Sequence, residues 1–238
     1  MPHAFSKYIQ THIFDAAFPP RTVGPPNANH AWSHRDDVTE LYYRDAAHLK
    51  SVFSSEYVRT TVGPDGKNFN DFETSINVMA TEKTISIATP LTIQMSDIAV
   101  ETGSATVAML FLASMEETTS GRQMEREVTP ILVSALEAHA PNDAWGLIAS
   151  TGLDSDFDLR KYFGGADMPV YALVYKVLLK STASVSAFRI AQGDFYSKAT
   201  GAFDQSHSFV VFGKEGTILD VSKGLRVSPS RSFHVHSC

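Results

Sequence analysis

The sequence contains one cysteine, Cys238, so the chain cannot form an internal disulfide bond. It has no run of about 18 apolar residues, the length that a membrane-spanning helix needs, and its first ten residues include no apolar signal segment. It also lacks an excess of basic residues, because the formal net charge is −6. That charge argues against nucleic acid as a partner. These absences predict a cytoplasmic protein that binds neither a membrane nor nucleic acid.

The sequence lacks the motifs of several large enzyme classes. It has no G-x-S-x-G, no P-loop and no G-x-G-x-x-G, which are typical of serine hydrolases, nucleotide hydrolases and dinucleotide-binding enzymes. Three short spacings imitate metal sites but fail their patterns: the histidine pair lies in a Pro/Asn-rich loop, the aspartate series lacks the later calcium-loop positions, and the last group is a short tail. They are His30 and His34; Asp154, Asp156 and Asp158; and His234, His236 and Cys238. We therefore predict no metal and no cofactor.

What is abundant is apolar surface. Hydrophobic residues make up 43% of the 238 residues, and 15 of them are phenylalanines. A chain of this size can bury a substantial core, either as one domain or as two smaller ones. The many aromatic side chains also suit the walls of an apolar cavity.

The first part of the chain reads as β-β-α-β. Alternating apolar and polar residues predict strands, a Pro- and Gly-rich stretch predicts a long loop, and Asp45 is placed to cap a helix. The strands are expected at 5–14, 36–45 and 73–87, the loop at 19–37 and the helix at 46–58.

The second part reads as β-α-β-β-α-β, the element order of ferredoxin-like domains. Strands are expected at 106–114, 143–151, 170–180 and 208–220, helices at 126–140 and 181–201, and a loop with one helical turn at 153–169. The two parts match in the order of their later elements, which indicates an internal duplication.

We therefore predict an α+β protein made of two ferredoxin-like repeats that pack as an intramolecular barrel around a cavity. The first repeat is expected to lack its opening strand and helix. The predicted boundaries are 1–87 for the first repeat, 88–105 for a linker, 106–222 for the second repeat and 223–238 for a tail. The molecule would be either a monomer in which the two repeats form a pseudo-dimer, or a homodimer.

Three stretches carry a family resemblance: KYIQTHI, DDVTELYYRDAAHLKSVFSSEYV and GPDGKNFND. Together they resemble the second strand, the third strand with its helix, and the following turn of EthD-type proteins in the dimeric α+β barrel superfamily. The resemblance covers about residues 5–75. The later stretch VTPILVSAL resembles a degenerate His-x-Pro-Leu motif of that family, with Thr129 at the histidine position.

The resemblance implies a cofactor-independent enzyme that acts by proton transfer on a hydrophobic small molecule, aromatic or polyketide-derived. Decarboxylation, cyclisation, isomerisation and oxygenation are the reactions that it suggests. The absent strand and helix and the loss of the histidine at Thr129 favour an alternative, a non-catalytic binding or structural relative. A third interpretation is that upstream sequence is missing.

Tyr8, Gln10 and His12 share one face of the strand at 5–14 and form the first part of the predicted site. If this face lines the barrel, His12 serves as the general acid or base, Tyr8 polarises a carbonyl or enolate, and Gln10 binds substrate. The alternative is that the three residues close the barrel rim through structural hydrogen bonds.

Five further residues complete the predicted substrate-binding set: Asp37, Glu40, Tyr43, Tyr171 and Tyr175. A carboxylate inside a barrel would have a raised pKa and could act as a base, which would apply to Asp37 and Glu40. Otherwise, Glu40 forms a salt bridge with a lysine or arginine, and the two later tyrosines pack in the core.

Overall fold

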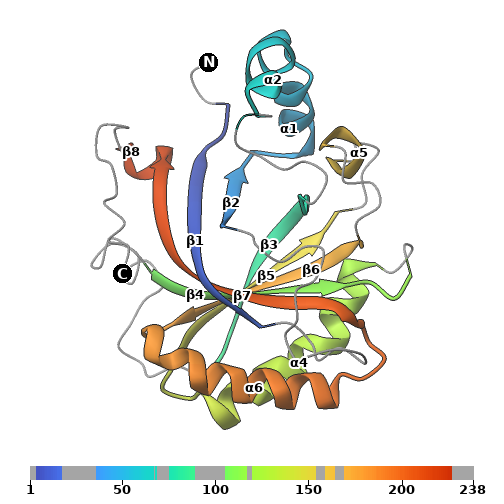
Figure 1. Ribbon diagram of the computed structural model, residues 1–238, viewed down its shortest axis with the longest axis vertical. Helices are drawn as coiled ribbons and strands as arrows, with labels where there is room; N and C mark the ends of the chain where they lie inside the picture. The colour runs from blue at the N-terminus through green and yellow to red at the C-terminus, as the bar shows by residue number, and fades with distance from the viewer. Residues whose placement is uncertain are drawn as a thin grey trace.

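A single antiparallel sheet organises the parts of the chain that the computed structural model describes. These parts are residues 4–17, 36–66, 68, 75–88, 105–116, 120–153, 159–163 and 169–226. The sheet has the strand order β2-β1-β7-β4-β6-β5-β3, and β8 pairs with β7 as an eighth strand. The sheet is strongly curled, and α4 and α6 lie together on its outer side (Figure 1). The predicted α+β class is confirmed.

Seven of the eight strands overlap the predicted segments, although β3 is much shorter than predicted, and β8 lies in the predicted tail. They are β1 (Lys7–Ala17), β2 (Asp37–Tyr42), β3 (Ala80–Ile85), β4 (Ala105–Ala113), β5 (Ala144–Gly152), β6 (Tyr171–Leu179), β7 (Asp204–Asp220) and β8 (Leu225–Arg226). The helices are α1 (Ala46–Phe53), α2 (Gly63–Gly66), α4 (Gly121–His139), α5 (Leu159–Phe163) and α6 (Val185–Lys198), with a π-helical turn at Val58–Val62 and 3₁₀ turns at Thr182–Ser184 and Val221–Lys223.

The segment from β4 to β7 has the predicted order β4-α4-β5-β6-α6-β7, and its strands lie side by side as β7-β4-β6-β5. The strands β1, β2 and β3 extend this sheet at its two ends. The existence of two repeats and their predicted boundaries stay predictions. Most of the predicted loop at 19–37, most of the linker at 88–105 and most of the tail at 223–238 lie outside the described residues.

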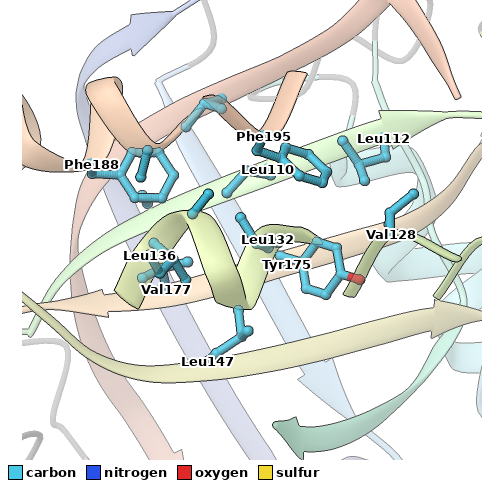
Figure 2. Close-up of a cluster of buried hydrophobic side chains, with 14 of the residues drawn as sticks. Leu110, Leu112, Val128, Leu132, Leu136, Leu147, Tyr175, Val177, Phe188 and Phe195 are labelled. Atoms are coloured by element: carbon cyan, nitrogen blue, oxygen red, sulfur yellow. The ribbon is translucent and has the colours of Figure 1, made fainter. Parts of the chain in front are cut away.

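The convex face of the sheet carries the larger core. On α4, Val128, Leu132 and Leu136 recur every four residues, so they form one apolar stripe against the sheet. Phe188 and Phe195 of α6 complete the same cluster (Figure 2). The covering of this face by two helices fixes which side chains of β4 and β6 point away from the barrel.

The concave face carries a second apolar cluster. Val107, Met109 and Phe111 of β4 contribute to it, and the Phe111 ring stacks on Phe209 with centroids 4.9 Å apart. All nine residues of β4 are buried, which explains why this strand reads as a continuous apolar run rather than an alternating one.

Strand β1 joins the two parts of the chain, because it pairs with β2 on one side and with β7 on the other. Thr11 lies opposite Val38 of β2 and Glu215 of β7. Next to this point, Gly213 allows close approach: a Cβ there would collide with the Thr11 methyl group and the His12 carbonyl oxygen. The sheet path ends at β2 and β3, and the Tyr42 hydroxyl of β2 donates a 2.7 Å hydrogen bond to Glu82 of β3.

Candidate active site

A buried lysine crosses the concave face. Lys176 of β6 is 3% exposed, and its Nζ donates to Oε2 of Glu40 at 2.6 Å and to Oε2 of Glu215 at 2.8 Å. Glu40 lies on β2 and Glu215 on β7, and β2 and β6 are separated by three other strands in the sheet. The sheet must therefore curl for these groups to meet. We call Lys176, Glu40 and Glu215 the charge cluster.

The electrostatics of the cluster make its members unequal. Burial raises the pKa of the Glu40 carboxyl, and this effect outweighs the opposite influence of Lys176. Burial alone would lower the pKa of Lys176, but the Glu40 and Glu215 carboxylates together raise it above its usual value. Lys176 therefore stays an ammonium ion, and Glu40 is a carboxyl group that takes up a proton more readily than an ordinary glutamate.

The hydroxyl of Tyr42 lies beside the charge cluster. It donates to Glu82 at 2.7 Å and lies 3.5 Å from Oε1 of Glu40. Burial raises the pKa of Tyr42, and the neighbouring carboxylates of Glu40 and Glu82 raise it further. Tyr42 therefore remains a protonated phenol, able to donate a hydrogen bond at the end of the sheet path.

The predicted face of β1 points outward. Ile9 and Thr11 are buried on the inner side, whereas His12 is exposed and Tyr8 and Gln10 are only partly buried. The Tyr8 hydroxyl lies 3.5 Å from Oε1 of Gln10. Burial raises the pKa of Tyr8. The structure thus places Tyr8, Gln10 and His12 together, but on the opposite face of the sheet from the charge cluster, and their catalytic roles stay predictions.

Two predicted residues of the β2 region lie on the same outer side. The exposed Asp37 accepts a 2.7 Å hydrogen bond from Nε2 of Gln10. Tyr43 follows β2 and packs its ring against His48 and Phe53 of α1. Burial raises the pKa of Tyr43 to about 12. Of the carboxylates predicted on this strand, only Glu40 points to the concave face.

The two predicted tyrosines of β6 lie on different faces. Tyr171 belongs to the concave cluster, and its hydroxyl donates to the His207 carbonyl oxygen at 3.0 Å. Tyr175 lies under α4 in the convex core (Figure 2). Its hydroxyl lies 2.5 Å from Oγ1 of Thr129. Burial raises the pKa of Tyr175. The structure therefore brings Glu40 and Tyr171 to the concave face and leaves Tyr175 outside it.

The pair formed by Thr129 and Tyr175 allows a test of its structural role. We expect Tyr175→Phe to lower the free energy of unfolding by about 0.5–1.5 kcal/mol, the net value of one hydrogen bond. Thr129→Val should cost more, about 1–3 kcal/mol, because it leaves the buried tyrosine hydroxyl without a partner. Urea unfolding of the two variants measures the difference, and the reverse order would show that the bond does not hold α4 to β6.

Lys176 and Glu215 were absent from the predicted site. Lys176 was visible as the one charged residue within VYALVYKVLL, an otherwise apolar strand. A lysine at such a position needs a carboxylate partner, since an unpaired buried charge is very costly. Glu215 gave no such signal, because it lies in the charged stretch GKEGT.

The described residues contain no group of three or more His, Cys, Asp or Glu side chains placed to hold a metal ion. All residues of the three metal-like spacings lie outside the described residues. No helix in the described ranges is both long and apolar enough to span a membrane.

The curled antiparallel sheet, with helices on its convex side, is consistent with the dimeric α+β barrel class of fold. Comparison with known families gives one match: residues 1–73 match the model of the EthD domain family. The match extends over β1, β2, α1 and α2, so the predicted resemblance is confirmed there. No curated protein and no solved structure was found to match the chain.

Proposed function

We propose that this protein is a cofactor-independent enzyme of the EthD type that acts by proton transfer on a hydrophobic, aromatic or polyketide-derived small molecule. The environment of Glu40 is the observation that supports this proposal most strongly. Its carboxyl group lies on the concave face, is largely buried, has a raised pKa and belongs to the part of the chain that matches the EthD domain. Such a carboxyl suits general acid–base catalysis near neutral pH.

The neighbours of Glu40 have complementary roles in this proposal. The Lys176 ammonium is positioned by two carboxylates and would stabilise negative charge that develops on a substrate oxygen. The Tyr42 hydroxyl lies 3.5 Å from Glu40, and it would become a second donor to a substrate oxygen by turning its one O–H away from Glu82. The chemistry thus moves from the predicted His12 and Tyr8 to Glu40, Lys176 and Tyr42.

One observation favours a second candidate, a non-catalytic relative with a structural charge cluster. The Lys176 side chain spans the concave face and ties β2 to β6 and β7. A buried ion pair of this kind can serve only to fix the arrangement of the strands. In that case Glu40 would hold the sheet in shape and would transfer no proton to a ligand.

Exchange of hydrogen for deuterium in an aromatic ketone distinguishes the two candidates. We expect the protein to accelerate exchange at the α-carbon of 2-tetralone, followed by NMR, and Glu40→Gln to reduce this acceleration by about 10²–10⁴-fold. The rate should rise with pH as Glu40 ionises, with its inflection above the usual range for glutamate, because the pKa of Glu40 is raised.

The matched control is Glu127→Gln, which removes an exposed glutamate on α4, on the far side of the sheet. Its exchange rate should equal that of the unaltered protein, and thermal unfolding should show that both variants are folded. If the folded Glu40→Gln variant exchanges as fast as the control, or if the unaltered protein gives no acceleration, the non-catalytic candidate is correct.

A further inference from the structure

Thr11 has unused hydrogen-bonding capacity in a buried position. The residue is fully buried, and its hydroxyl oxygen has no hydrogen-bond partner among the described residues. Buried hydroxyl groups are normally paired, and leaving one unpaired costs free energy. Thr11 lies directly opposite Glu215 in the β1–β7 ladder and on the same face, so its side chain borders the charge cluster.

Lys176 has unused capacity at the same place. An ammonium group carries three N–H donors, and within the described residues Lys176 uses two of them, toward Glu40 and Glu215. A third donor is therefore available on Lys176, and the Thr11 hydroxyl, which can donate or accept, belongs to the residue opposite its partner Glu215. A carbonyl oxygen has two lone pairs and can accept from both groups at once.

The charges around this position select against anions. Lys176 is the cationic partner of both Glu40 and Glu215, and a third carboxyl group, that of the exposed Glu82, lies nearby and accepts a hydrogen bond from Tyr42. A ligand carboxylate would have to enter beside these groups and lose its own hydration. The carboxylates of Glu40 and Glu215 would repel the ligand carboxylate, and this repulsion is far larger in a buried site than in water.

We infer that the site takes an uncharged ketone, whose carbonyl oxygen accepts hydrogen bonds from Lys176 and Thr11, and that it rejects carboxylate ligands. This inference rests on the proposed function and narrows its substrate class. It favours isomerisation or cyclisation through an enolate and excludes decarboxylation, since that reaction needs a carboxylate substrate.

The corresponding step balances without any added oxidant or reductant. Glu40, as carboxylate, removes a proton from the carbon next to the carbonyl; the C–H electron pair becomes the C=C bond of an enolate. The negative charge moves to the carbonyl oxygen, where Lys176 and Thr11 hold it. When the proton on Glu40 is replaced by a deuteron from the solvent, delivery of that deuteron to the same carbon gives exchange, and delivery of the proton to another carbon gives an isomerised ketone.

Two ligands with the same ring system test the inference by binding alone. We expect the full chain to bind 2-acetylnaphthalene at least about tenfold more tightly than 2-naphthoate in calorimetric titrations at neutral pH, where the acid is ionised. Thr11→Val, which keeps the shape of the side chain, should weaken ketone binding by about 5–10-fold, the effect of one hydrogen bond. It should leave thermal unfolding unchanged or improved, since the hydroxyl has no partner to lose.

The control is Thr39→Val on β2. Thr39 is exposed and lies on the same outward face of the strand as Asp37, so this substitution should leave both affinities unchanged. Equal or tighter binding of naphthoate overturns the inference, as does unchanged ketone binding by Thr11→Val. If ketone binding depends on Thr11 but Glu40→Gln has no effect on exchange, the ligand class stands and the proposed enzymatic function fails. If Glu40→Gln slows exchange but Thr11→Val leaves ketone binding unchanged, the proposed enzymatic function stands and the inferred ligand class fails.

Discussion

Replacement of Lys176 by methionine should lower the free energy of unfolding by about 3–5 kcal/mol, because it leaves two buried carboxylates without their cation. Lys176 donates to both Glu40 and Glu215 and is almost fully buried. Methionine nearly matches the length of the lysine stem, so most of the loss comes from charge rather than from a cavity. Urea unfolding monitored by circular dichroism measures the change.

The loss should depend on pH with a definite sign. Burial already raises the pKa of Glu40 above that of the unfolded chain, and removal of the Lys176 charge raises it further. Carboxyl groups with raised pKa values favour the folded state below their unfolded pKa, and this contribution is lost as pH rises through the folded pKa. The variant should therefore approach the unaltered protein in stability as the pH falls toward about 5 and fall behind it above neutrality.

Two further variants separate this explanation from a general effect of losing a lysine. Lys180→Met removes an exposed lysine just after β6 and should change the unfolding free energy by less than about 0.5 kcal/mol. Adding Glu40→Gln and Glu215→Gln to Lys176→Met should restore much of the lost stability, since no uncompensated charge then remains. Equal stability of Lys176→Met and Lys180→Met would show that the charge cluster does not hold the sheet together.

Gly213→Ala should give the second large effect, a loss of about 1–3 kcal/mol or more of unfolding free energy from overpacking. The new Cβ would meet the methyl group of Thr11 and the carbonyl oxygen of His12, and a backbone atom cannot move aside as a side-chain end can. The strain falls on the β1–β7 ladder. Hydrogen exchange of the β1 amides should therefore rise more than that of the β4 amides.

Gly193→Ala is the matched control for this substitution. Gly193 lies in α6, and a Cβ at that position would meet nothing within 4 Å. Alanine there should stabilise the protein by about 0.5–1 kcal/mol, because glycine is a poor helix residue. If both glycine variants change stability in the same direction and to the same extent, close packing at Gly213 is not the cause.

Local patterns predicted the elements well because each has a strong periodicity of its own. The strand over 170–180, for example, is β6 at Tyr171–Leu179, and Asp45 accepts a hydrogen bond from the His48 backbone N–H as the predicted cap of α1. Such features depend on residues within one or two turns of each other. They need no knowledge of the tertiary fold.

The face of each strand was harder to predict. Alternation in β1 separates Tyr8, Gln10 and His12 from Ile9 and Thr11, but it does not say which set points inward. Apolar burial decided this, since Ile9 is 2% exposed. The polar set was expected inside because of the functional interpretation, and the structure places it outside.

In β6, alternation itself fails. Tyr171 and Tyr175 are four residues apart and should share a face, but the register with β4 shifts between Leu112 and Ala113. Tyr171 therefore joins the concave cluster and Tyr175 the convex core. The partners of Lys176 were equally hidden, because Glu40 lies 136 residues away along the chain and meets it only when the sheet curls.

The position of β1 has a consequence for how this chain is made. Lys7 pairs with Asp220, so one edge of β1 cannot pair with β7 until the ribosome has added more than two hundred further residues. During that time its hydrogen-bonding groups on that side face water or a chaperone, with only β2 available as a neighbour. Before β7 is made, the unpaired β1 is less prone to aggregation than an apolar strand would be, because one of its faces carries Tyr8, Gln10 and His12.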